Sequence, residues 1–491
     1  MKITLIATYS TMGWDYPTRL LSAVLKKNGF ETRIVYIPII PGQSNIDDNN
    51  LKQLVDLSAG SGLIGISLMT NFVNGSVKIT QALKNQLNIP IIWGGIHPTL
   101  RPHECLNYAD MVCIGEGEET LIELVKSLEK GHDIKTISGL GYKRNDKVFI
   151  NNPRLVIQNL DGLPFPDYEC KDDYLLENGS LTKIDKNILQ KEMTRPTHTS
   201  KKAYTIYHTM TSRGCPFICT YCCHSALNKI QPSQKKTRER SIDNIIKEFL
   251  VTREIMPDIN CFLINDDSFF SRSKDDISNF AKEYKKKIGL PLWVTGLHIL
   301  KFDKTKLSLL IAAGLKFIRL GIQSGSENTK KIYKRHYSNQ QVIAVAKEIN
   351  KFKNKIAPPS YDIVLDNPWE SEKDLVQTLI FLSKLPKPYE LEVFSLTFYP
   401  GTDLYEKAKK EGIIKNDIEE IYNKSYYLLK PTLLNEIFKL VRDNARKGRF
   451  IPTWFFVLLL NPVLRRLFDI IFIFGKRVYK FYKLLKNSFE F

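Results

Sequence analysis

The sequence lacks several features that would place it in a class at once. It has only eight cysteines in 491 residues, too few for a disulfide scaffold, so we expect a reducing compartment. It has no apolar run of the ~18–20 residues that a membrane-crossing helix needs. Its N-terminus carries the short apolar run 3–7 but not the cleavage-site pattern of a signal peptide. Together these absences predict a cytoplasmic protein.

Acidic residues are also scarce. The chain has 52 Asp and Glu against 71 Lys and Arg, which gives a net charge of +19. Such an excess attracts either nucleic acid or an anionic membrane surface. The C-terminal stretch 430–491 is basic and also rich in Phe, Leu and Ile, and this combination favours lipid. Because no module of aromatic and basic residues is evident, we expect no nucleic-acid partner.

Length and composition predict a folded protein with more than one domain. Hydrophobic residues make up 43% and charged residues 25%, as in globular proteins. A chain of 491 residues favours two or three domains. We expect them at residues 1–140, 201–404 and 405–491, with a linker at 141–200.

Short apolar runs alternate with amphipathic stretches near the N-terminus. This alternation predicts a doubly wound parallel sheet with helices on both faces, whose ligands bind beyond the carboxyl ends of the strands. Two glycine-rich turns, Gly94–Thr99 and Gly115–Glu118, follow expected strands. The expected strands are 3–7, 32–37, 63–68, 89–92 and 111–114, and the expected helices are 18–28 and 77–86.

A second alternating series follows the linker, which contains several prolines and no clear periodicity. Six strands separated by helical stretches predict a full or partial β/α barrel. These strands are expected at 204–209, 260–264, 292–295, 317–322, 360–365 and 392–398.

The region from 405 onwards is expected to be helical and to change character near Arg449. Its apolar runs, 455–460 and 470–474, are interrupted by Pro462 and by charged residues. An interfacial helix pair at the membrane fits this pattern, with basic side chains at the lipid head groups. The alternative is a C-terminal helix packed on the barrel. The basic residues in question are Arg465, Arg466, Lys476, Arg477, Lys480, Lys483 and Lys486.

Three cysteines crowd into eight residues, in the segment Arg213–Cys223 that follows an expected strand. Thiolates at this spacing, Cys215, Cys219 and Cys222, can hold three irons of a [4Fe–4S] cluster and leave the fourth iron open to a ligand. Spacing alone also allows a zinc site completed by His224, or plain buried cysteines. The remaining cysteines outside the segment are scattered singly, so a single cluster is predicted; they are Cys105, Cys113, Cys170 and Cys261.

This motif, with an aromatic residue just before its last cysteine, resembles the signature of the radical S-adenosylmethionine (radical SAM) superfamily. The resemblance implies that the three cysteines hold the cluster and that the open iron binds S-adenosylmethionine through its amino and carboxylate groups. It also places Tyr221 near the adenine and gives Cys223 no role. Asp266 and Asp267, at the end of the second barrel strand, match the polar groups that receive the methionine amino group. An ordinary helix cap is the alternative for these aspartates.

Two later segments extend the resemblance, and one departs from it. Gln323, Ser324 and Glu327 follow the fourth barrel strand, where the family contacts the ribose and carboxylate. The turn Tyr399–Thr402 closes the barrel as it does in many members with an N-terminal cobalamin domain. Where relatives often have a Gly-Phe-Pro-Gly-Glu-like turn, this chain reads Leu365–Glu370 and lacks the glycines.

The N-terminal glycine-rich turns are similar to those of the cobalamin-binding domain that precedes many radical SAM barrels. Glycines at strand ends let the backbone approach the flat cofactor. The loop 8–14 after the first strand has no His, so cobalamin is expected without a lower axial His ligand, or it has been lost. His97 is interpreted as a loop contact rather than a cobalt ligand. The expected cobalamin contacts are Gly94, Gly95, His97, Gly115 and Glu116.

The resemblance implies an enzyme that cleaves S-adenosylmethionine reductively, with a reducing electron donor, to a radical that abstracts hydrogen. The leading hypothesis is methylation of an unactivated carbon with cobalamin as the methyl donor. A cobalamin-dependent cyclase or rearrangement enzyme is a second reading, and a cobalamin-binding or lipid-associated regulatory protein with a degenerate barrel is a third. The basic, aromatic C-terminal region suggests a lipid or isoprenoid substrate and peripheral membrane contact, while another small-molecule natural product or a peptide precursor stays open.

Overall fold

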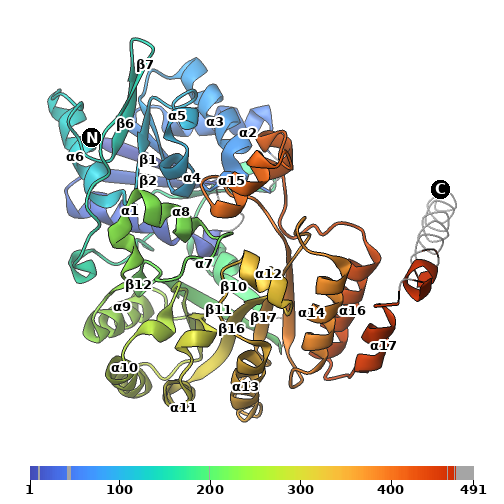
Figure 1. Cartoon of the computed structure of the whole chain (residues 1–491). Coiled ribbons are helices and arrows are strands. Elements are labelled where there is room, and N and C mark those ends of the chain that lie inside the picture. The colour runs from blue at the N-terminus through green and yellow to red at the C-terminus, as the bar shows by residue number, and fades with distance from the viewer. Residues whose placement is uncertain (9–11, 41–45, 198–199, 462, 469, 471–491) are drawn as a thin grey trace, which may run out of the picture. The chain divides into compact units, whose positions relative to one another are not determined.

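The chain divides into two compact units in the computed structural model shown in Figure 1. The structure describes residues 1–8, 12–40, 46–197, 200–461, 463–468 and 470. The first unit comprises residues 1–318 and 397–425, and the second comprises 319–396 together with the described part of 426–491.

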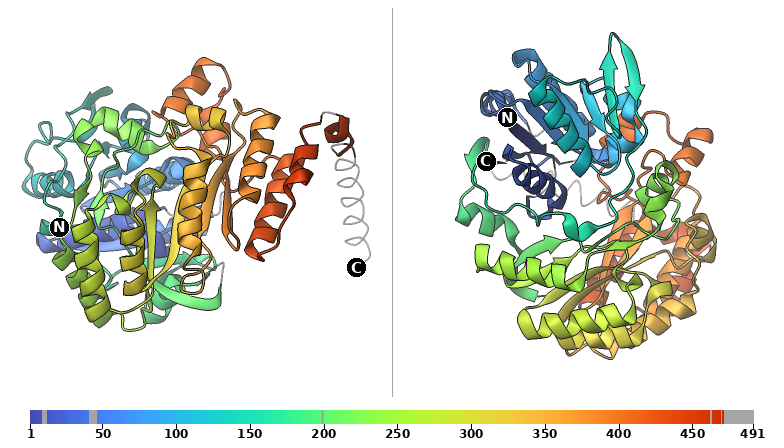
Figure 2. Two further views of the ribbon diagram at one scale, coloured as in Figure 1. Left: turned by 60° about the horizontal axis from the view of Figure 1, so that its bottom comes forward. Right: turned by 90° about the vertical axis from the view of Figure 1, so that its left-hand side faces the viewer.

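The first unit begins with the expected doubly wound sheet. Its five parallel strands have the order β5-β4-β3-β1-β2, so the winding reverses between β1 and β3. Helices cover both faces, with α1 packed against α6 and α2 against α3 (Figure 2). The strands are β1 (Lys2–Ala7), β2 (Glu31–Tyr36), β3 (Leu63–Ser67), β4 (Ile91–Gly94) and β5 (Met111–Cys113). The helices are α1 (Tyr16–Lys27), α2 (Asp48–Ser58), α3 (Val73–Gln86) and α6 (Glu118–Lys130).

Local sequence signals explain these boundaries. The Asp15 carboxylate accepts a hydrogen bond from the Thr18 backbone N–H at the start of α1. Helix α6 ends at Gly131, which has a φ of 66° and terminates the helix in the left-handed conformation. One face of the sheet is closed by an apolar cluster in which Leu124 and Val125 are fully buried.

The interval 141–200, treated above as a linker, contributes strands to both edges of the same sheet. The hairpin of β6 (Leu140–Arg144) and β7 (Lys147–Ile150) pairs antiparallel with β5. The hairpin of β8 (Tyr174–Glu177) and β9 (Ser180–Lys183) adds to β2. The outer strands β7 and β9 are largely exposed, so they carry little of the apolar periodicity that reveals a buried strand.

The second alternating series has the six parallel strands and intervening helices of a partial β/α barrel, as the sequence predicts. Strands β11, β14 and β15 lie in the first unit, β16 crosses the division after Ile318, and β17 and β18 lie in the second. An unexpected strand, β10 (Thr194–Thr197), pairs antiparallel with β11. The six strands are β11 (Ser200–Thr209), β14 (Cys261–Ile264), β15 (Leu292–Leu297), β16 (Leu315–Gln323), β17 (Ser360–Leu365) and β18 (Glu390–Ser395). The helices are α9 (Ile242–Ile255), α10 (Lys274–Lys287), α11 (Lys304–Ala313), α12 (Glu327–Ile332), α13 (Asn339–Asn350) and α14 (Glu372–Ser383).

The C-terminal region is helical and is shared between the units. Helix α15 (Asp403–Lys410) and a π-helix (Ile418–Tyr422) belong to the first unit. Helices α16 (Leu433–Arg446) and α17 (Thr453–Leu458) belong to the second. Among the described residues, no helix is both long and apolar enough to span a bilayer. The expected run 470–474 lies outside the described residues beyond Ile470, as do the basic positions from Lys476 onwards.

Candidate functional site

The cysteine motif forms a compact loop between strand β12 (Ser212–Arg213) and helix α8 (Cys223–Ile230). Cys215 and Cys219 are buried, while Cys222 is half-buried and occupies the N-cap position of α8. The Cys222 backbone N–H donates to the Cys219 carbonyl oxygen at 3.1 Å, which folds the last two cysteines into one turn. The fold therefore presents the three motif cysteines from a single short loop.

The three thiols suit a [4Fe–4S] cluster in number and in kind. Burial raises the pKa of the Cys215 thiol to about 12, with smaller contributions from Asp267, Cys222 and Cys219. The thiols thus lie near enough to influence one another, and loading with metal would release their protons. Among the described residues, no three His, Cys, Asp or Glu side chains converge on a point where one ion would sit. A cluster spreads its ligands further apart than a single ion does, so the donor set remains suited to it.

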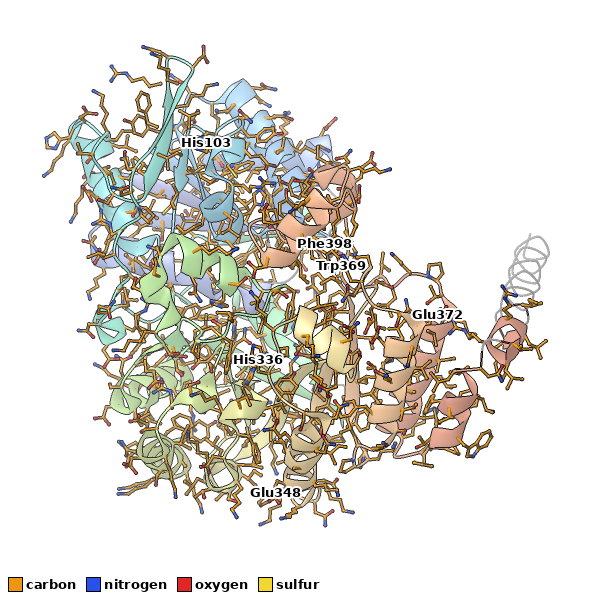
Figure 3. All side chains as sticks on the ribbon, viewed as in Figure 1. His103, His336, Glu348, Trp369, Glu372 and Phe398 are labelled. Carbon is orange, nitrogen blue, oxygen red and sulfur yellow. The ribbon has the colours of Figure 1, made fainter. Side chains whose placement is uncertain are left out.

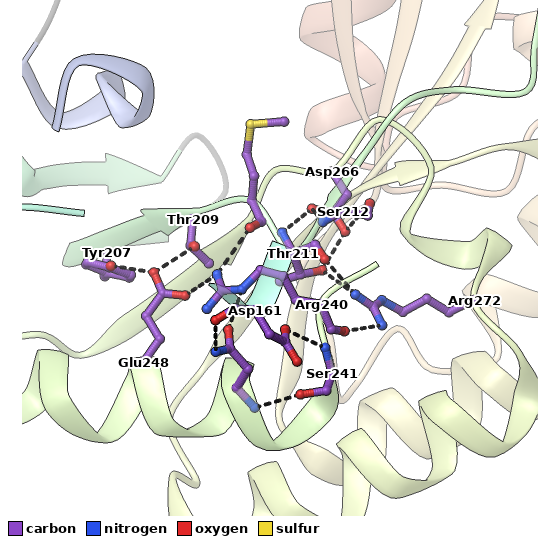
Figure 4. Close-up of polar contacts among 12 residues, drawn as sticks. Asp161, Tyr207, Thr209, Thr211, Ser212, Arg240, Ser241, Glu248, Asp266 and Arg272 are labelled. Carbon is purple, nitrogen blue, oxygen red and sulfur yellow. Dashed lines mark hydrogen bonds and ion pairs between the residues drawn. The ribbon is translucent and has the colours of Figure 1, made fainter. Parts of the chain in front are cut away.

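Asp266 holds the strand that leads into the cysteine loop. Its carboxylate, almost fully buried, accepts hydrogen bonds from the backbone N–H groups of Thr211 at 2.6 Å and Ser212 at 3.1 Å. It also accepts from the hydroxyls of the same two residues, at 2.5 and 2.7 Å. Figure 4 shows this clamp together with Arg272, which donates to the Thr211 carbonyl oxygen at 2.7 Å. The carboxylate that the resemblance assigns to S-adenosylmethionine is thus occupied in positioning the loop.

A buried ion pair supports strand β11 and the residues between it and β12. The Arg240 guanidinium donates to the Glu248 carboxylate, and both side chains are buried (Figure 4). Glu248 also accepts hydrogen bonds from the Tyr207 hydroxyl at 2.6 Å and the Thr209 hydroxyl at 2.9 Å. Arg240 also donates to the Met210 carbonyl oxygen at 3.3 Å, five residues before Cys215. Buried charges arranged in this way leave the residues before the cysteines little freedom to move.

Asp267, the neighbour of Asp266, reaches the cysteine loop directly. Its carboxylate lies 2.8 Å from Nε2 of His224, the residue two positions after Cys222. Burial alone would lower the pKa of His224, but the hydrogen bond that its Nε2 donates to Asp267 raises the pKa to about 9. The cysteine loop also contacts His298, on which the ring of Phe217 stacks with centroids 3.6 Å apart. Tyr221 is half-buried on the same loop.

The turn 399–402 also packs on the cysteine loop. The Leu404 backbone N–H donates to the Thr220 carbonyl oxygen at 3.1 Å, and Lys229 of α8 pairs with Asp403 at 2.7 Å. A side chain at Gly401 would press on Ala226 of α8, at 3.3 Å. The expected closing turn therefore meets the cysteine loop within the first unit.

A cavity of about 280 Å³ opens at the carboxyl ends of β1, β3, β4 and β5, where the winding of the N-terminal sheet reverses. Its walls come from the glycine-rich turns on one side and from the entrance of the cysteine loop on the other. Gly95 has a φ of 110°, and a Cβ there would lie 2.5 Å from the Leu68 carbonyl oxygen. The glycines lining the cavity are Gly65, Gly94, Gly95, Gly115 and Gly117, and residues from the cysteine side are Met210, Arg213, Gly214, His224, Arg238 and Asp267.

This cavity fits part of a cobalamin. Ligands of doubly wound sheets bind at the point where the strand order reverses, and the cavity occupies that point. Its walls are mainly apolar, and the bare backbone of five glycines would lie against a flat ring without side chains in the way. Gly94, Gly95, Gly115 and Glu116, all expected as cobalamin contacts, line it.

Ion pairs join the two walls of the cavity. Arg213, which precedes Gly214 and Cys215, pairs with Glu118 and lies 3.2 Å from Glu116. Arg238 donates to both oxygens of Glu116, at 2.8 and 3.1 Å. Although burial acts to raise it, these bonds hold the pKa of Glu116 below its ordinary value. Neither arginine is marked by a pattern in the sequence, although Arg213 stands directly beside the cysteine motif.

His97 lies away from this cavity. Its side chain is fully buried, and Nδ1 lies 3.2 Å from the Thr70 hydroxyl. Its ring meets Tyr422 edge to face at 5.3 Å, and burial lowers its pKa to about 3. His97 is not among the residues that line the cavity.

The second unit contains the other expected S-adenosylmethionine contacts. Gln323 ends β16 with a φ of 65°, and its Oε1 is buried without a partner among the described residues. The Ser324 hydroxyl donates to Glu370 at 3.3 Å, and burial raises the pKa of Glu370 to about 7. Glu327 is exposed and pairs with Lys330 at 2.6 Å.

The turn at 365–370 replaces glycine with aspartate. Asp366 has a φ of 62°, a conformation that aspartate tolerates better than most residues. Its carboxylate accepts hydrogen bonds from the Ser395 hydroxyl at 2.7 Å, the Lys430 backbone N–H at 3.0 Å and the Asn435 side chain at 2.8 Å. Asp366 thus ties the end of β17 to α16. Figure 3 labels Trp369 in this turn and Glu372 at the start of α14. Glu372 pairs with Arg465 at 2.9 Å.

Comparison with known families agrees with both halves of this site. Residues 3–125 match the B12 binding domain, and residues 209–382 match the Radical SAM superfamily. The chain therefore belongs to the radical SAM enzymes that carry an N-terminal cobalamin-binding domain.

Relatives in sequence and in structure include methyltransferases. An uncharacterized methyltransferase from Pyrococcus horikoshii is 29% identical over 72% of this chain and 70% of its own. The bacteriochlorophyllide d C-8(2)-methyltransferase of Chlorobaculum tepidum is 21% identical over 81% of this chain and 79% of its own. The fold is also that of the radical S-adenosylmethionine methyltransferase TsrM from Kitasatospora setae, with a TM-score of 0.65 and 16% identity over 84% of this chain and 76% of TsrM.

Proposed function

We propose that this enzyme methylates an unactivated carbon of a lipid, isoprenoid or other natural-product substrate. One observation carries the proposal. Arg213, directly before the cysteine loop, pairs with Glu116 and Glu118, and all three residues line the glycine-rich cavity. Such a connection keeps a radical-generating site and a methyl-donor site next to one another. The names of the methyltransferase relatives support the same reaction.

When bound, the cluster supplies the electron that cleaves S-adenosylmethionine, and cobalamin supplies the methyl group. The chain's own residues bind and orient. Asp266 fixes Thr211 and Ser212, so the loop that carries Cys215 starts from a rigid point. The Gly95 backbone and its neighbours would lie against the flat ring of a bound cobalamin, and Leu5, Ile66 and Leu121 would exclude water from the cavity.

We further propose that cobalamin binds here without a histidine ligand to cobalt. His97, the one histidine in the expected contact set, has its Nδ1 at Thr70. His224, which does line the cavity, is paired through Nε2 with Asp267 at 2.8 Å. The place of His97 outside the cavity lining supports this view. Spectra of the bound cobalamin in His97→Gln protein should match those of the unaltered protein; a shift in the cobalt absorption bands would contradict it.

The remaining partners follow from the chemistry. A reducing electron donor must reach the cluster, and we expect it in the cytoplasm, where thiols stay reduced. The basic and apolar C-terminal region supports peripheral contact with the inner face of a membrane, where a lipid or isoprenoid substrate would be found. No nucleic-acid partner is proposed.

A non-methylating cyclase or rearrangement enzyme is the second candidate. The anaerobic magnesium-protoporphyrin IX monomethyl ester cyclase of Synechocystis is 29% identical over 33% of this chain and 28% of its own. A ring closure would use the same radical without transferring a methyl group.

Anaerobic incubation of reconstituted protein with S-adenosylmethionine, cobalamin, a reductant and a host lipid extract separates these candidates. 5′-Deoxyadenosine together with S-adenosylhomocysteine, both lost in Cys219→Ala protein, is the result expected of the methyltransferase. Deoxyadenosine alone favours the cyclase. If neither product forms, or the cluster does not reconstitute, the regulatory alternative replaces the enzyme.

A further inference from the structure

An open groove lies in the second unit between the end of α14 and the start of α17. It has a volume of about 560 Å³ and is remote in sequence from every residue of the cysteine loop and the glycine-rich turns. Two lysines, two hydroxyls, an aromatic ring and a leucine line it, with no carboxylate among them: Ser383, Lys384, Leu385, Lys387, Phe450 and Thr453.

Lys387 is a half-buried cation, and no carboxylate among the described residues forms an ion pair with it. Its Nζ donates to the Ser383 carbonyl oxygen at 3.1 Å and lies 5.1 Å from the centre of the Phe450 ring. Burial lowers its pKa, and no carboxylate opposes that effect. A charge removed from water costs free energy unless an opposite charge approaches it. With two N–H donors still available on Lys387 and with Lys384 exposed beside it, the groove is a receptor for an anion.

An apolar strip borders the groove. Trp454, Val457 and Leu458 of α17 are 64%, 47% and 37% exposed, and their spacing places them on one face of the helix. Phe450, which lines the groove, is itself 63% exposed. Large exposed apolar side chains gathered in one place mark a surface that meets a partner. The side chains next along the chain continue the pattern, with Val463, Leu467 and Ile470 all exposed.

The charge of residues 444–491 indicates which kind of partner fits the groove and the apolar strip. Residues 444–491 contain ten Lys and Arg but only two acidic residues. A free phosphate would engage the lysines but leave the tryptophan and its neighbours in water. An apolar protein partner would leave the unpaired lysines without an anion. An anionic bilayer satisfies both, because its phosphates lie directly above acyl chains.

We propose that the groove binds the phosphate of an anionic phospholipid in a bilayer surface, with Lys384 and Lys387 as its ligands and Trp454 and Phe450 inserted beside it. This inference rests on the membrane contact included in the proposed function and gives that contact a specific site. It brings the second unit to the lipid phase from which a lipid or isoprenoid substrate would be drawn.

Co-sedimentation of the full chain with vesicles tests the proposal. Vesicles of about equal parts phosphatidylcholine and phosphatidylglycerol are compared with phosphatidylcholine alone. The double variant Lys384→Gln, Lys387→Gln should weaken binding to the anionic vesicles about thirty-fold, as expected for the loss of two cations at such a surface. A matched control, Lys285→Gln with Lys286→Gln on α10, removes the same charge from exposed positions and should change binding less than about threefold.

A second variant tests the apolar strip. Trp454→Ser should also weaken vesicle binding while leaving the thermal unfolding midpoint unchanged, because Trp454 is exposed. The proposal is overturned if phosphatidylcholine vesicles bind equally well, or if the groove and control variants lose the same affinity. It is equally overturned if Trp454→Ser changes the oligomeric state in sedimentation and not the vesicle binding, since a second copy of the chain would then cover the strip.

Failure of this proposal and failure of the proposed function give different results. Lys384 and Lys387 take no part in the cysteine loop or the cavity, so the double variant should still form 5′-deoxyadenosine in detergent-free solution. If the unaltered chain forms no 5′-deoxyadenosine but still binds anionic vesicles, the proposed enzymatic function is refuted and the proposed phosphate-binding groove is not.

Discussion

Replacing Arg213 with glutamine should destabilise the first unit far more than an ordinary surface charge would. Arg213 and Glu118 are 17% and 7% exposed, and Glu116 is 14% exposed, so the substitution leaves two largely buried carboxylates short of a partner. Breaking a buried ion pair from one side costs roughly 3–5 kcal/mol. That is a large share of a typical unfolding free energy of about 5–15 kcal/mol.

Arg154 provides a matched control in the same unit. It also pairs with two glutamates of α6, Glu119 and Glu123, but these are 54% and 47% exposed. Water screens such a pair, so Arg154→Gln should cost only about 0–1 kcal/mol.

The assay is anaerobic urea unfolding followed by circular dichroism, with iron and bound cobalamin measured on the same samples. Arg213→Gln protein should unfold at lower urea and lose both cofactors together, because the residue stands between the cysteine loop and the cavity. Equal midpoints for the Arg213 and Arg154 variants would refute the reasoning, and so would loss of iron with cobalamin binding fully retained.

Three further outcomes follow from the same contacts. Asp266→Ala should cost about 3–5 kcal/mol and lower iron per chain after reconstitution, since four donors of Thr211 and Ser212 lose their acceptor; normal iron loading would argue against the clamp. Because the folded-state pKa of Glu116 lies below the ordinary value of 4.5, its contribution to stability is present above that pH and is lost as the pH falls below it. Glu116→Gln protein should lack this part of the acid dependence in urea titrations between pH 6 and pH 3, and an unchanged profile would contradict it. Gly95→Ala forces a Cβ against the Leu68 carbonyl oxygen and should reduce cobalamin affinity at least tenfold in equilibrium titration, whereas Gly131→Ala at an open helix end should not.

Local signals predicted most of the fold and the segments that make up the candidate site. The cysteine spacing is contained in eight residues, and the glycine turns follow strands whose apolar runs are continuous, so both can be read along the chain. The six barrel strands and the five parallel strands of the first sheet occur where the periodicity places them.

What could not be predicted depends on residues distant in sequence or weak in pattern. Arg213 and Glu118 are 95 positions apart, and nothing along the chain pairs them. The outer strands of the two edge hairpins, β7 and β9, bury too little to show alternation. Asp366 stands where relatives often have glycine. Its carboxylate accepts hydrogen bonds from Lys430 and Asn435, which a glycine could not do. The domain boundaries and the roles of individual cofactor contacts stay predictions.

The division of the chain has a consequence for its synthesis. The first unit is interrupted by residues 319–396 and resumes at 397–425. Asn71 donates to the Lys424 carbonyl oxygen at 2.8 Å, and Tyr422 donates to Glu104 at 2.7 Å, so short helices of the N-terminal domain are contacted by residues made 353 and 318 positions later. A nascent chain on the ribosome must therefore keep its N-terminal portion unfinished until residue 425 has emerged. Premature termination anywhere before that point would release a polypeptide with this portion still incomplete.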